Sequence, residues 1–281
     1  MNAPAVPGLA TQLDETAAAF DSVAATYDGP QGNNHLIRRM RELVWATIDR
    51  FVPAGGTVLD IGCGTGIDAA HLAARGDDVI ATDWSSAMVE RTRARTVAVD
   101  PAGAAAGSID ARRLGVQELG ELVAEGVRLR GAISNFGPLN CDPDLRATAR
   151  TLGQLVEPGG RLVFSVIGRA CPWEIAHYVA ERRFRRAAVR FRRGATAVGM
   201  NGHTIWTRYY WPRSFTRCFA ADFRVVHRST LSLFVPPPYL TSVSERRPRL
   251  HRALVRADDI TSGWPIVREF GDHFLVVLER R

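Results

Sequence analysis

The sequence contains no lysine, and all 36 of its basic residues are arginines. A net charge of +7 is compatible with a nucleic-acid partner, because clustered positive charge attracts phosphates. However, an arginine-only, alanine-rich chain is equally typical of a GC-rich coding bias. We therefore do not expect a nucleic-acid partner on charge alone.

Paired cysteines and long hydrophobic runs are also missing. The isolated Cys63, Cys141, Cys171 and Cys218 include no C-x-x-C pair, which argues against a disulfide framework and against a cysteine-bound metal. The longest apolar stretches, such as 161–167, fall far short of the roughly 20 residues that span a bilayer. The N-terminus lacks the basic and apolar regions of a secretory signal. We expect a cytoplasmic protein with no bound metal and no transmembrane segment.

The middle of the chain alternates apolar strands with helical patterns, which is typical of a parallel sheet covered by helices. Strands are expected at Thr57–Ile61, 78–82, a segment ending near Asp110, 127–136 and 161–167. Helices are expected at 13–27, 35–52, Ile67–Ala74, 86–95 and 143–156, the last capped by Asp142.

This alternation breaks after Gly168. A long helix at 173–193, strands at 202–211 and 223–235, a helix around 244–257 and a last strand at 273–279 are expected. We divide the chain into a disordered tail with N-terminal cap helices (1–52), a ligand-binding α/β core (53–168), a cap insertion (169–212) and a C-terminal completion of the sheet (213–281). Residues 1–11 are expected to be disordered.

The decisive motif is the segment 58–66, which reads VLDIGCGTG. A buried strand leads into glycines spaced G-x-G-x-G, whereas a dinucleotide-binding turn has G-x-G-x-x-G. Asp60 precedes the first glycine by two residues, and a carboxylate there would repel a pyrophosphate but would suit an ammonium group. Asp83 follows Gly62 by 21 residues at the end of the second strand, where a carboxylate can accept hydrogen bonds from ribose hydroxyls.

At these residues the chain resembles the class I S-adenosylmethionine-dependent methyltransferases of the small-molecule type. The similarity continues at 83–88, 109–111 and 155–162 and covers about residues 20–168. It implies an α/β fold with a Rossmann-like open seven-stranded sheet, mostly parallel with an antiparallel last strand, and a helical cap. It also implies S-adenosyl-L-methionine as the cofactor.

The resemblance assigns cofactor contacts to particular residues. The methionine part would lie against Asp60, Gly62 and Gly64, and the ribose against Asp83. The remaining contacts would involve the adenine and the amino group of the cofactor, with a covering position at Tyr27; the residues are Trp84, Met88, Asp110, Ala111, Ser134, Asn135 and Tyr27. For several of these residues, a packing or turn role is the alternative.

Candidate acceptor contacts come from the cap and from the rim of the sheet. Because the last strand is antiparallel in this family, its first residue would lie beside the cofactor. The candidates are Asn140, Trp173, Trp206, Tyr210 and His273, each of which could instead serve packing or local hydrogen bonding. No residue is identified as a catalytic base.

The sequence thus predicts methyl transfer to a small-molecule acceptor, with the methylated atom (O, N or C) left open. RNA or protein methylation and a non-methylating, cofactor-binding protein are the alternatives. Seven arginines between positions 182 and 193 indicate a solvated helix face, an acidic acceptor or an anionic membrane surface. The oligomeric state is not predicted.

Overall fold

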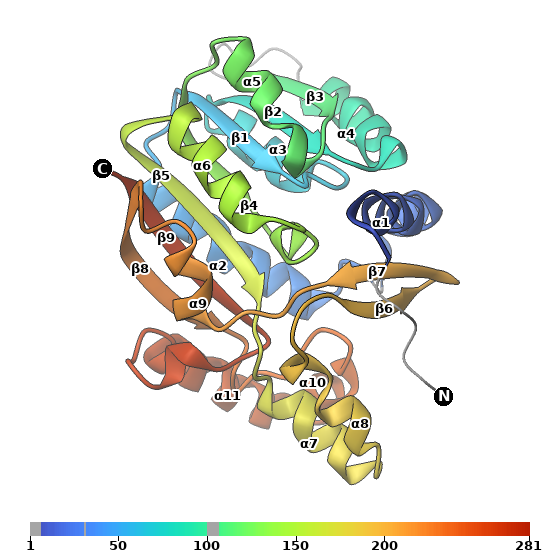
Figure 1. Cartoon of the computed structure of the whole chain (residues 1–281). Helices are drawn as coiled ribbons and strands as arrows, with labels where there is room; N and C mark the ends of the chain where they lie inside the picture. The colour runs from blue at the N-terminus through green and yellow to red at the C-terminus, as the bar shows by residue number, and fades with distance from the viewer. Residues whose placement is uncertain (1–6, 31, 100–106) are drawn as a thin grey trace.

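A seven-stranded mixed sheet forms the centre of the protein (Figure 1). The computed structural model describes residues 7–30, 32–99 and 107–281. The strands lie in the order β3-β2-β1-β4-β5-β9-β8, and β9 is antiparallel to both of its neighbours while the other six are parallel. Their bounds are β1 Thr57–Ile61, β2 Asp78–Asp83, β3 Ile109–Arg113, β4 Leu129–Ser134, β5 Val156–Ile167, β8 Phe223–Leu231 and β9 His273–Arg280. This arrangement confirms the expected fold.

Two hydrophobic cores cover the two faces of the sheet. One core joins the sheet to α5 Gly120–Ala124, α6 Leu145–Leu155 and α9 Pro212–Arg217. The other joins it to α2 His35–Phe51 and α3 Ile67–Ala74. Successive residues of a strand face opposite sides. Leu59 and Ile61 therefore enter the first core, while Val58 and the buried Asp60 face α2 and α3.

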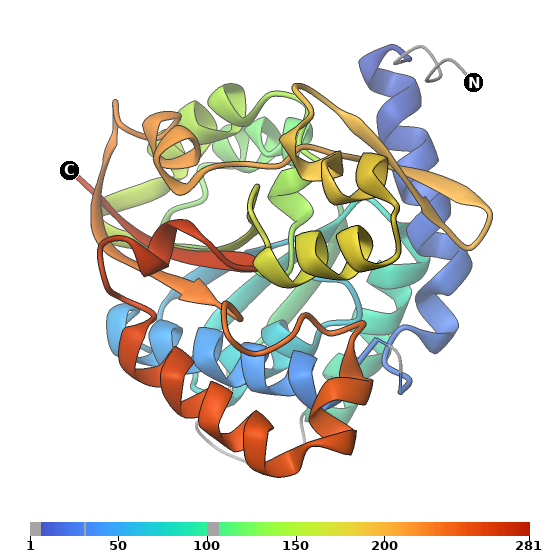
Figure 2. The ribbon, with the colours of Figure 1, turned by 90° about the horizontal axis from the view of Figure 1, so that it is seen from below.

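The C-terminal helices α10 Thr241–Arg246 and α11 Pro248–Thr261 lie beside α2 (Figure 2). The rings of His35 and His251 pack edge to face with their centroids 6.0 Å apart, and Arg39 forms an ion pair with Asp259. These contacts fasten the helices to the side of the molecule away from α5 and α6. None of the helices within the described ranges is long and apolar enough to cross a membrane.

A cover extends over the carboxyl edge of the parallel strands. It combines α1 Leu9–Val23 with a hairpin of β6 Thr196–Met200 and β7 His203–Thr207, which lie against each other in Figure 1. The Trp206 indole donates to Glu15, and Arg208 donates to Gln12 at 3.1 Å. We call α1 and this hairpin the cover. Its two parts are 170 residues or more apart in the sequence but act as one packed unit.

Several expected boundaries are wrong in the cap region. The single helix expected at 173–193 is divided into α7 Pro172–Ala180, α8 Phe184–Ala187 and a 3-10 turn at Val189–Phe191. Arg182 adopts a left-handed φ of 57°, which interrupts the helix. The strand expected at 202–211 is shorter and pairs with β6, which had no expected counterpart.

Three other boundaries also differ. Helix α1 begins at Leu9, inside the stretch expected to be disordered, of which residues 1–6 lie outside the described ranges. The helix α4 runs over Ser86–Val99, and β3 begins at Ile109 instead of ending near Asp110. Asp144, rather than Asp142, caps α6 by accepting hydrogen bonds from two backbone N–H groups.

Phe215 of α9 is the centre of an aromatic cluster and has no exposed surface. It packs against the rings of Phe164, Phe219 and Phe274. We predict that Phe215→Ala lowers the free energy of unfolding by about 3–5 kcal/mol, because it leaves a cavity in a packed core. Urea unfolding followed by circular dichroism measures the change.

The matched control is Phe184→Ala in α8, whose side chain is 64% exposed. We expect it to change the free energy of unfolding by no more than about 0.5 kcal/mol. Equal losses for the two variants would contradict the assignment of Phe215 to the core.

Candidate active site

A cavity of about 400 Å³ lies at the carboxyl edge of the sheet, beneath the cover. Its floor is formed by the turn after β1, the end of β2 and the loop after β4, and its roof by α1 and the hairpin. Residues from all five segments line it, including Phe20, Tyr27, Gly62, Gly64, Asp83, Trp84, Met88, Asn135, Pro138, Ile205 and Tyr209. The cavity thus lies where open α/β folds place their ligands.

Gly62 and Gly64, in the turn after β1, have different structural roles. Gly62 has a φ of 71°, and a Cβ there would lie 2.3 Å from Cβ of Pro138. Gly64 has a φ of 55°, and a Cβ there would meet nothing within 4 Å. Gly62 therefore allows the loop after β4 to approach the turn, whereas Gly64 leaves open space beside the cavity.

Asp83 closes this turn from the neighbouring strand. Its carboxylate accepts hydrogen bonds from the backbone N–H of Gly64 at 2.9 Å and of Ser85 at 2.8 Å. Burial raises the pKa of Asp83 to about 6, although these hydrogen bonds oppose the shift. The carboxylate is thus held rigidly at the cavity wall, with lone pairs left for further donors.

Asp60 lies behind the wall, and its side chain does not line the cavity. The residue is 1% exposed, and none of the described residues donates a hydrogen bond to its Oδ2 atom. Burial raises the pKa of Asp60 well above its usual value; Asp68 and Asp83 raise it further, while Arg41 lowers it. A buried carboxylate so placed favours a cationic group nearby.

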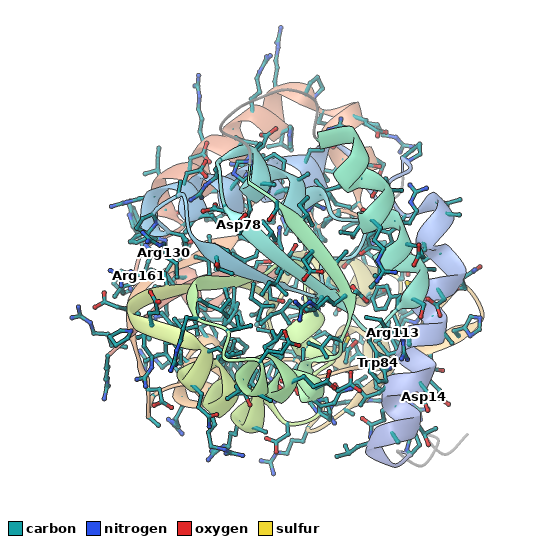
Figure 3. All side chains as sticks on the ribbon, turned by 90° about the horizontal axis from the view of Figure 1, so that it is seen from above. Asp14, Asp78, Trp84, Arg113, Arg130 and Arg161 are labelled. Atoms are coloured by element: carbon teal, nitrogen blue, oxygen red, sulfur yellow. The ribbon has the colours of Figure 1, made fainter. Side chains whose placement is uncertain are left out.

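Aromatic and apolar side chains form the end of the cavity beyond Asp83. Arg113 stacks over the Trp84 ring at 4.4 Å, and Figure 3 shows the two side chains together where the sheet meets α1. Met88 is buried. The Tyr27 ring meets Phe20 edge to face at 6.3 Å, and both line the cavity. This end is suited to a flat, apolar ring.

Two N-terminal aspartates fasten the cover to this site. Asp21 accepts hydrogen bonds from the Ser85 hydroxyl at 2.5 Å and from the N–H of Ala87 at 3.0 Å, so it caps α4 from outside. Asp28 accepts from Thr65 and Arg95, both at 2.6 Å. These contacts of Asp28 fix the chain next to Tyr27, which lines the cavity.

An additional polar network was missed by the sequence analysis. Asp68 accepts from Arg41 at 2.6 Å, from Trp45 at 2.7 Å and from Asn135 at 3.1 Å. Ser165 donates to Asn135 at 2.6 Å. Arg41 lies on the buried face of α2, and a charged residue among that helix's core positions was the available signal.

A comparison with known families identifies this arrangement. A family model described as a methyltransferase domain matches residues 35–228, which is more than half of the chain. The chain therefore belongs to the S-adenosylmethionine-dependent methyltransferases.

Individual relatives agree with this membership. The chain is 33% identical over 143 residues to a ubiquinone biosynthesis O-methyltransferase of Xanthomonas axonopodis pv. citri, covering 50% of this chain and 55% of that protein. It thus spans about half the length of the curated relatives it matches. A similar O-methyltransferase of Xylella fastidiosa is 32% identical over 161 residues, or 57% of this chain and 60% of that protein.

Solved structures share the fold at low sequence identity. An S-adenosylmethionine-dependent methyltransferase from Mesorhizobium loti matches with a TM-score of 0.54 and 19% identity, covering 88% of this chain and 100% of that one. The CcbJ methyltransferase from Streptomyces caelestis matches with a TM-score of 0.56 and 18% identity, covering 95% and 99%.

S-adenosylmethionine is the cofactor of this methyltransferase family, and the residues present fit it. Oδ2 of Asp60 is buried without a hydrogen-bond partner among the described residues, and such a carboxylate would favour the positive charge that this cofactor carries. Asp83 offers acceptor atoms for a ribose, and the apolar end beside Trp84 and Met88 offers a slot for adenine. Among the described residues, no three His, Cys, Asp or Glu side chains gather as metal ligands would.

Besides Asp60, the expected cofactor contacts Asp110, Ala111 and Ser134 and the expected acceptor contact Asn140 lie outside the cavity lining. Because β3 begins at Ile109, Asp110 pairs with Ile80, three residues before Asp83, and its carboxylate is held by Arg112 at 2.7 Å. Ala111 lies beside it in β3. The segment 114–117, just after β3, lines the cavity instead. Ser134 donates to the Ile61 carbonyl at 2.9 Å, and Asn140 binds backbone groups of Ile167 and Arg208.

Three aromatic residues expected to contact the acceptor are not among those that line the cavity. Ile205, Thr207 and Tyr209 line it, and Trp206, between the first two in β7, points to the opposite side. Trp206 binds α1, Tyr210 packs against Phe215 with centroids 5.6 Å apart, and Trp173 donates to the Phe234 carbonyl. Each of the three thus has a packing or hydrogen-bonding role here, and its contact with an acceptor stays a prediction. His273 lines a neighbouring cavity.

Asp83 generates a prediction about pH. A protonated Asp83 has lost a lone pair, so ribose binding should weaken by about tenfold per pH unit once the pH falls below about 6. The ligand to use is 5′-methylthioadenosine, which has the ribose but no ammonium, so that Asp60 contributes little. Isothermal titration calorimetry between pH 5 and pH 8 gives the affinity.

The control for this prediction is Asp83→Asn. We expect it to bind 5′-methylthioadenosine about tenfold to a hundredfold more weakly than the unaltered protein at pH 8, a loss of about 1.5–3 kcal/mol. Its affinity should not change between pH 5 and pH 8. A variant that retained the full pH dependence would show that another group causes it.

Proposed function

We propose that this methyltransferase transfers a methyl group from S-adenosylmethionine to a hydroxyl group of a small molecule. The observation that carries the proposal is the cavity of about 400 Å³ beneath the cover, whose lining combines the glycine turn and Asp83 with apolar residues of α1 and the hairpin. Its relatives from Xanthomonas and Xylella are ubiquinone biosynthesis O-methyltransferases, which supports oxygen as the methylated atom.

Residues on the floor of the cavity would hold the cofactor. Asp83 would accept both ribose hydroxyls, the backbone around Gly64 would lie against the methionine part, and Trp84 with Met88 would flank the adenine. The cofactor supplies an activated methyl group on a positively charged sulfur. Asp60 and Asp68 would hold negative charge near that sulfur, and Asn135 would be fixed by its hydrogen bonds to Asp68 and Ser165.

The roof would position the acceptor and exclude water. Leu13, Ala17 and Phe20 of α1 and Val198 and Ile205 of the hairpin give it an apolar lining. Such a lining favours a largely apolar acceptor and desolvates the reacting groups. Burial raises the pKa of the Cys141 thiol to about 12, so this cysteine stays protonated and does not compete as a nucleophile.

The enclosing cover also weighs against the alternatives. An RNA or a protein side chain needs an open groove beside the cofactor, and the cover occupies that space. A protein that binds the cofactor without transferring its methyl group would have the same floor. Only a transfer assay separates that alternative from the proposed function.

The test is methyl transfer from radiolabelled S-adenosylmethionine to three pools: phenols and catechols, transfer RNA, and unfolded protein. The proposal expects label in the first pool alone. Label in RNA or protein would replace it with a macromolecular function. S-adenosylhomocysteine binding without labelling of any pool would instead support a non-methylating role.

Two adjacent tyrosines provide a matched pair for the acceptor site. Tyr209 lines the cavity, whereas Tyr210 packs into the aromatic cluster around Phe215. We predict that Tyr209→Phe changes the KM for the acceptor by about threefold or more, because one polar contact contributes about 0.5–1.5 kcal/mol. The KM for S-adenosylmethionine should stay unchanged.

Tyr210→Phe, as the control, should leave both KM values unchanged. Steady-state kinetics with a phenol from the first pool measures both constants. If Tyr210→Phe altered the acceptor KM and Tyr209→Phe did not, the assignment of Tyr209 to the cavity and of Tyr210 to the core would have to be reversed.

A further inference from the structure

An arginine-rich surface lies on the outside of the cap, at α7, at α8 and at the turn that follows them. We call it the basic surface and define it by six exposed arginines: Arg182, Arg183, Arg185, Arg186, Arg192 and Arg193. Figure 1 places α7 and α8 beyond the end of β5, and Figure 2 shows them in yellow nearest the viewer. The basic surface is therefore within reach of a large partner.

The charge of the basic surface exceeds what the overall composition explains. The whole chain has 36 arginines and 29 acidic residues, whereas residues 175–221 contain ten arginines and a single acid, Glu181. A coding bias that replaces lysine with arginine does not remove acidic residues. Glu181 pairs with Arg183 at 3.2 Å, and within the described ranges no acidic side chain pairs with the other five arginines. Six arginines against one glutamate leave a net charge of +5.

Arg190, the seventh arginine of the segment 182–193, fastens this segment to the body of the protein. It is buried and donates to Glu174 of α7 and to Asp272 just before β9, both at 2.7 Å. It also donates to the carbonyl of Gly168 at 3.1 Å. The six exposed arginines therefore extend from a fixed support and not from a loose tail.

The corner between α7 and α8 is fixed as well. The backbone N–H groups of Arg182 and Arg183 donate to the carbonyls of Val179 and Tyr178, which closes the end of α7. The guanidinium groups of Arg183 and Arg186 lie 5.4 Å and 5.9 Å from the centroid of the Tyr178 ring. Little order therefore has to be gained when a partner binds this surface.

Apolar side chains are exposed among the arginines. Val179, Phe184 and Phe191 are between 44% and 64% exposed, and Phe184 stands directly between Arg183 and Arg185 in the sequence. Arginines interleaved with exposed aromatic side chains are typical of segments that lie in the interface of a membrane. The partner should therefore offer both negative charge and an apolar layer.

Two other classes of partner fit the basic surface less well. An RNA would supply phosphates for the arginines, but its backbone has no apolar layer to receive Val179 and Phe184. A second copy of this chain that used the same surface would bring equal positive charge against it, which is repulsive. Anionic phospholipids supply phosphates and an apolar layer together.

We propose that the basic surface binds the headgroups of an anionic phospholipid bilayer, with Phe184 inserted where the headgroups meet the acyl chains. Each arginine near such a surface strengthens binding by about fivefold, and an inserted ring adds buried apolar area. The inference goes beyond the proposed function, because no step of methyl transfer enters it.

The test is co-sedimentation with vesicles of phosphatidylglycerol and phosphatidylcholine, compared with vesicles of phosphatidylcholine alone. We expect the unaltered protein to bind the anionic vesicles at least about tenfold more tightly. The double variant Arg185→Gln, Arg192→Gln removes two arginines that have no ion pair within the described ranges. It should bind the anionic vesicles about twentyfold more weakly. Phe184→Ala should bind them about fivefold more weakly, because it has lost an apolar ring.

The matched control is the double variant Arg150→Gln, Arg217→Gln. It removes the same charge from exposed positions on α6 and α9, which cover one face of the sheet. We expect its affinity for the anionic vesicles to stay within about twofold of that of the unaltered protein, because charges beyond about 10 Å are screened. Every variant should keep the affinity of the unaltered protein for S-adenosylhomocysteine, which shows that the fold is intact.

Three results would overturn the proposal: no binding to the anionic vesicles, equal affinity for the two kinds of vesicle, or equal losses for the two double variants. A labelled transfer RNA is titrated in parallel. If the RNA bound, the anionic vesicles did not, and Arg185→Gln, Arg192→Gln abolished RNA binding, the partner would be a nucleic acid instead. These measurements require no methyl transfer, so their failure would leave the proposed function standing.

Discussion

The site is organised by an excess of buried negative charge at the carboxyl edge of the sheet. Asp60, Asp68 and Asp83 converge there because β1, the helix after it and β2 all end or begin at this edge. Arg41 pairs with Asp68 at 2.6 Å, but Oδ2 of Asp60 has no hydrogen-bond partner among the described residues. Such an arrangement reduces the stability of the empty protein and favours a cationic ligand. S-adenosylmethionine carries a sulfonium and an ammonium, so the charge of the floor and the family's cofactor are complementary.

The rest of the architecture encloses this charged floor. Asp21 and Asp28 fasten the cover to the amino ends of α4 and α3, and Trp206 fastens the hairpin to α1. The cover therefore excludes water from the carboxylates. Because less water screens them, these carboxylates interact more strongly with other charges. On the opposite side, Arg190 joins Glu174 to Asp272 and separates the two cavities. At this wall, as at the floor of the cofactor cavity, buried carboxylates outnumber buried cations.

The sequence located the glycine turn and Asp83 at the carboxyl edge of the sheet because the signals for them are local. The glycine turn, Asp60 and Asp83 belong to short strand–turn–helix segments in which spacing determines position. The roof was predicted poorly because its geometry depends on pairing between distant segments. After β7 the chain turns Tyr209 to the cavity and Tyr210 to the aromatic cluster, and no local pattern distinguishes two adjacent tyrosines. Asp110 was misplaced by a boundary error of a few residues in β3, whereas Arg41 was missed because its partner Asp68 lies 27 residues away.

The central claim, that buried charge at the floor destabilises the empty protein and binds the cofactor, is tested most directly by Asp60→Asn. The folded protein binds the Asp60 proton more tightly than the unfolded chain, so its stability falls as the pH rises above the unfolded value of about 4. Thermal unfolding at pH 8 is measured with and without S-adenosylhomocysteine. The account predicts a higher Tm than that of the unaltered protein without ligand and a smaller rise in Tm on ligand binding. A lower Tm without ligand, together with an undiminished rise on binding, would contradict it.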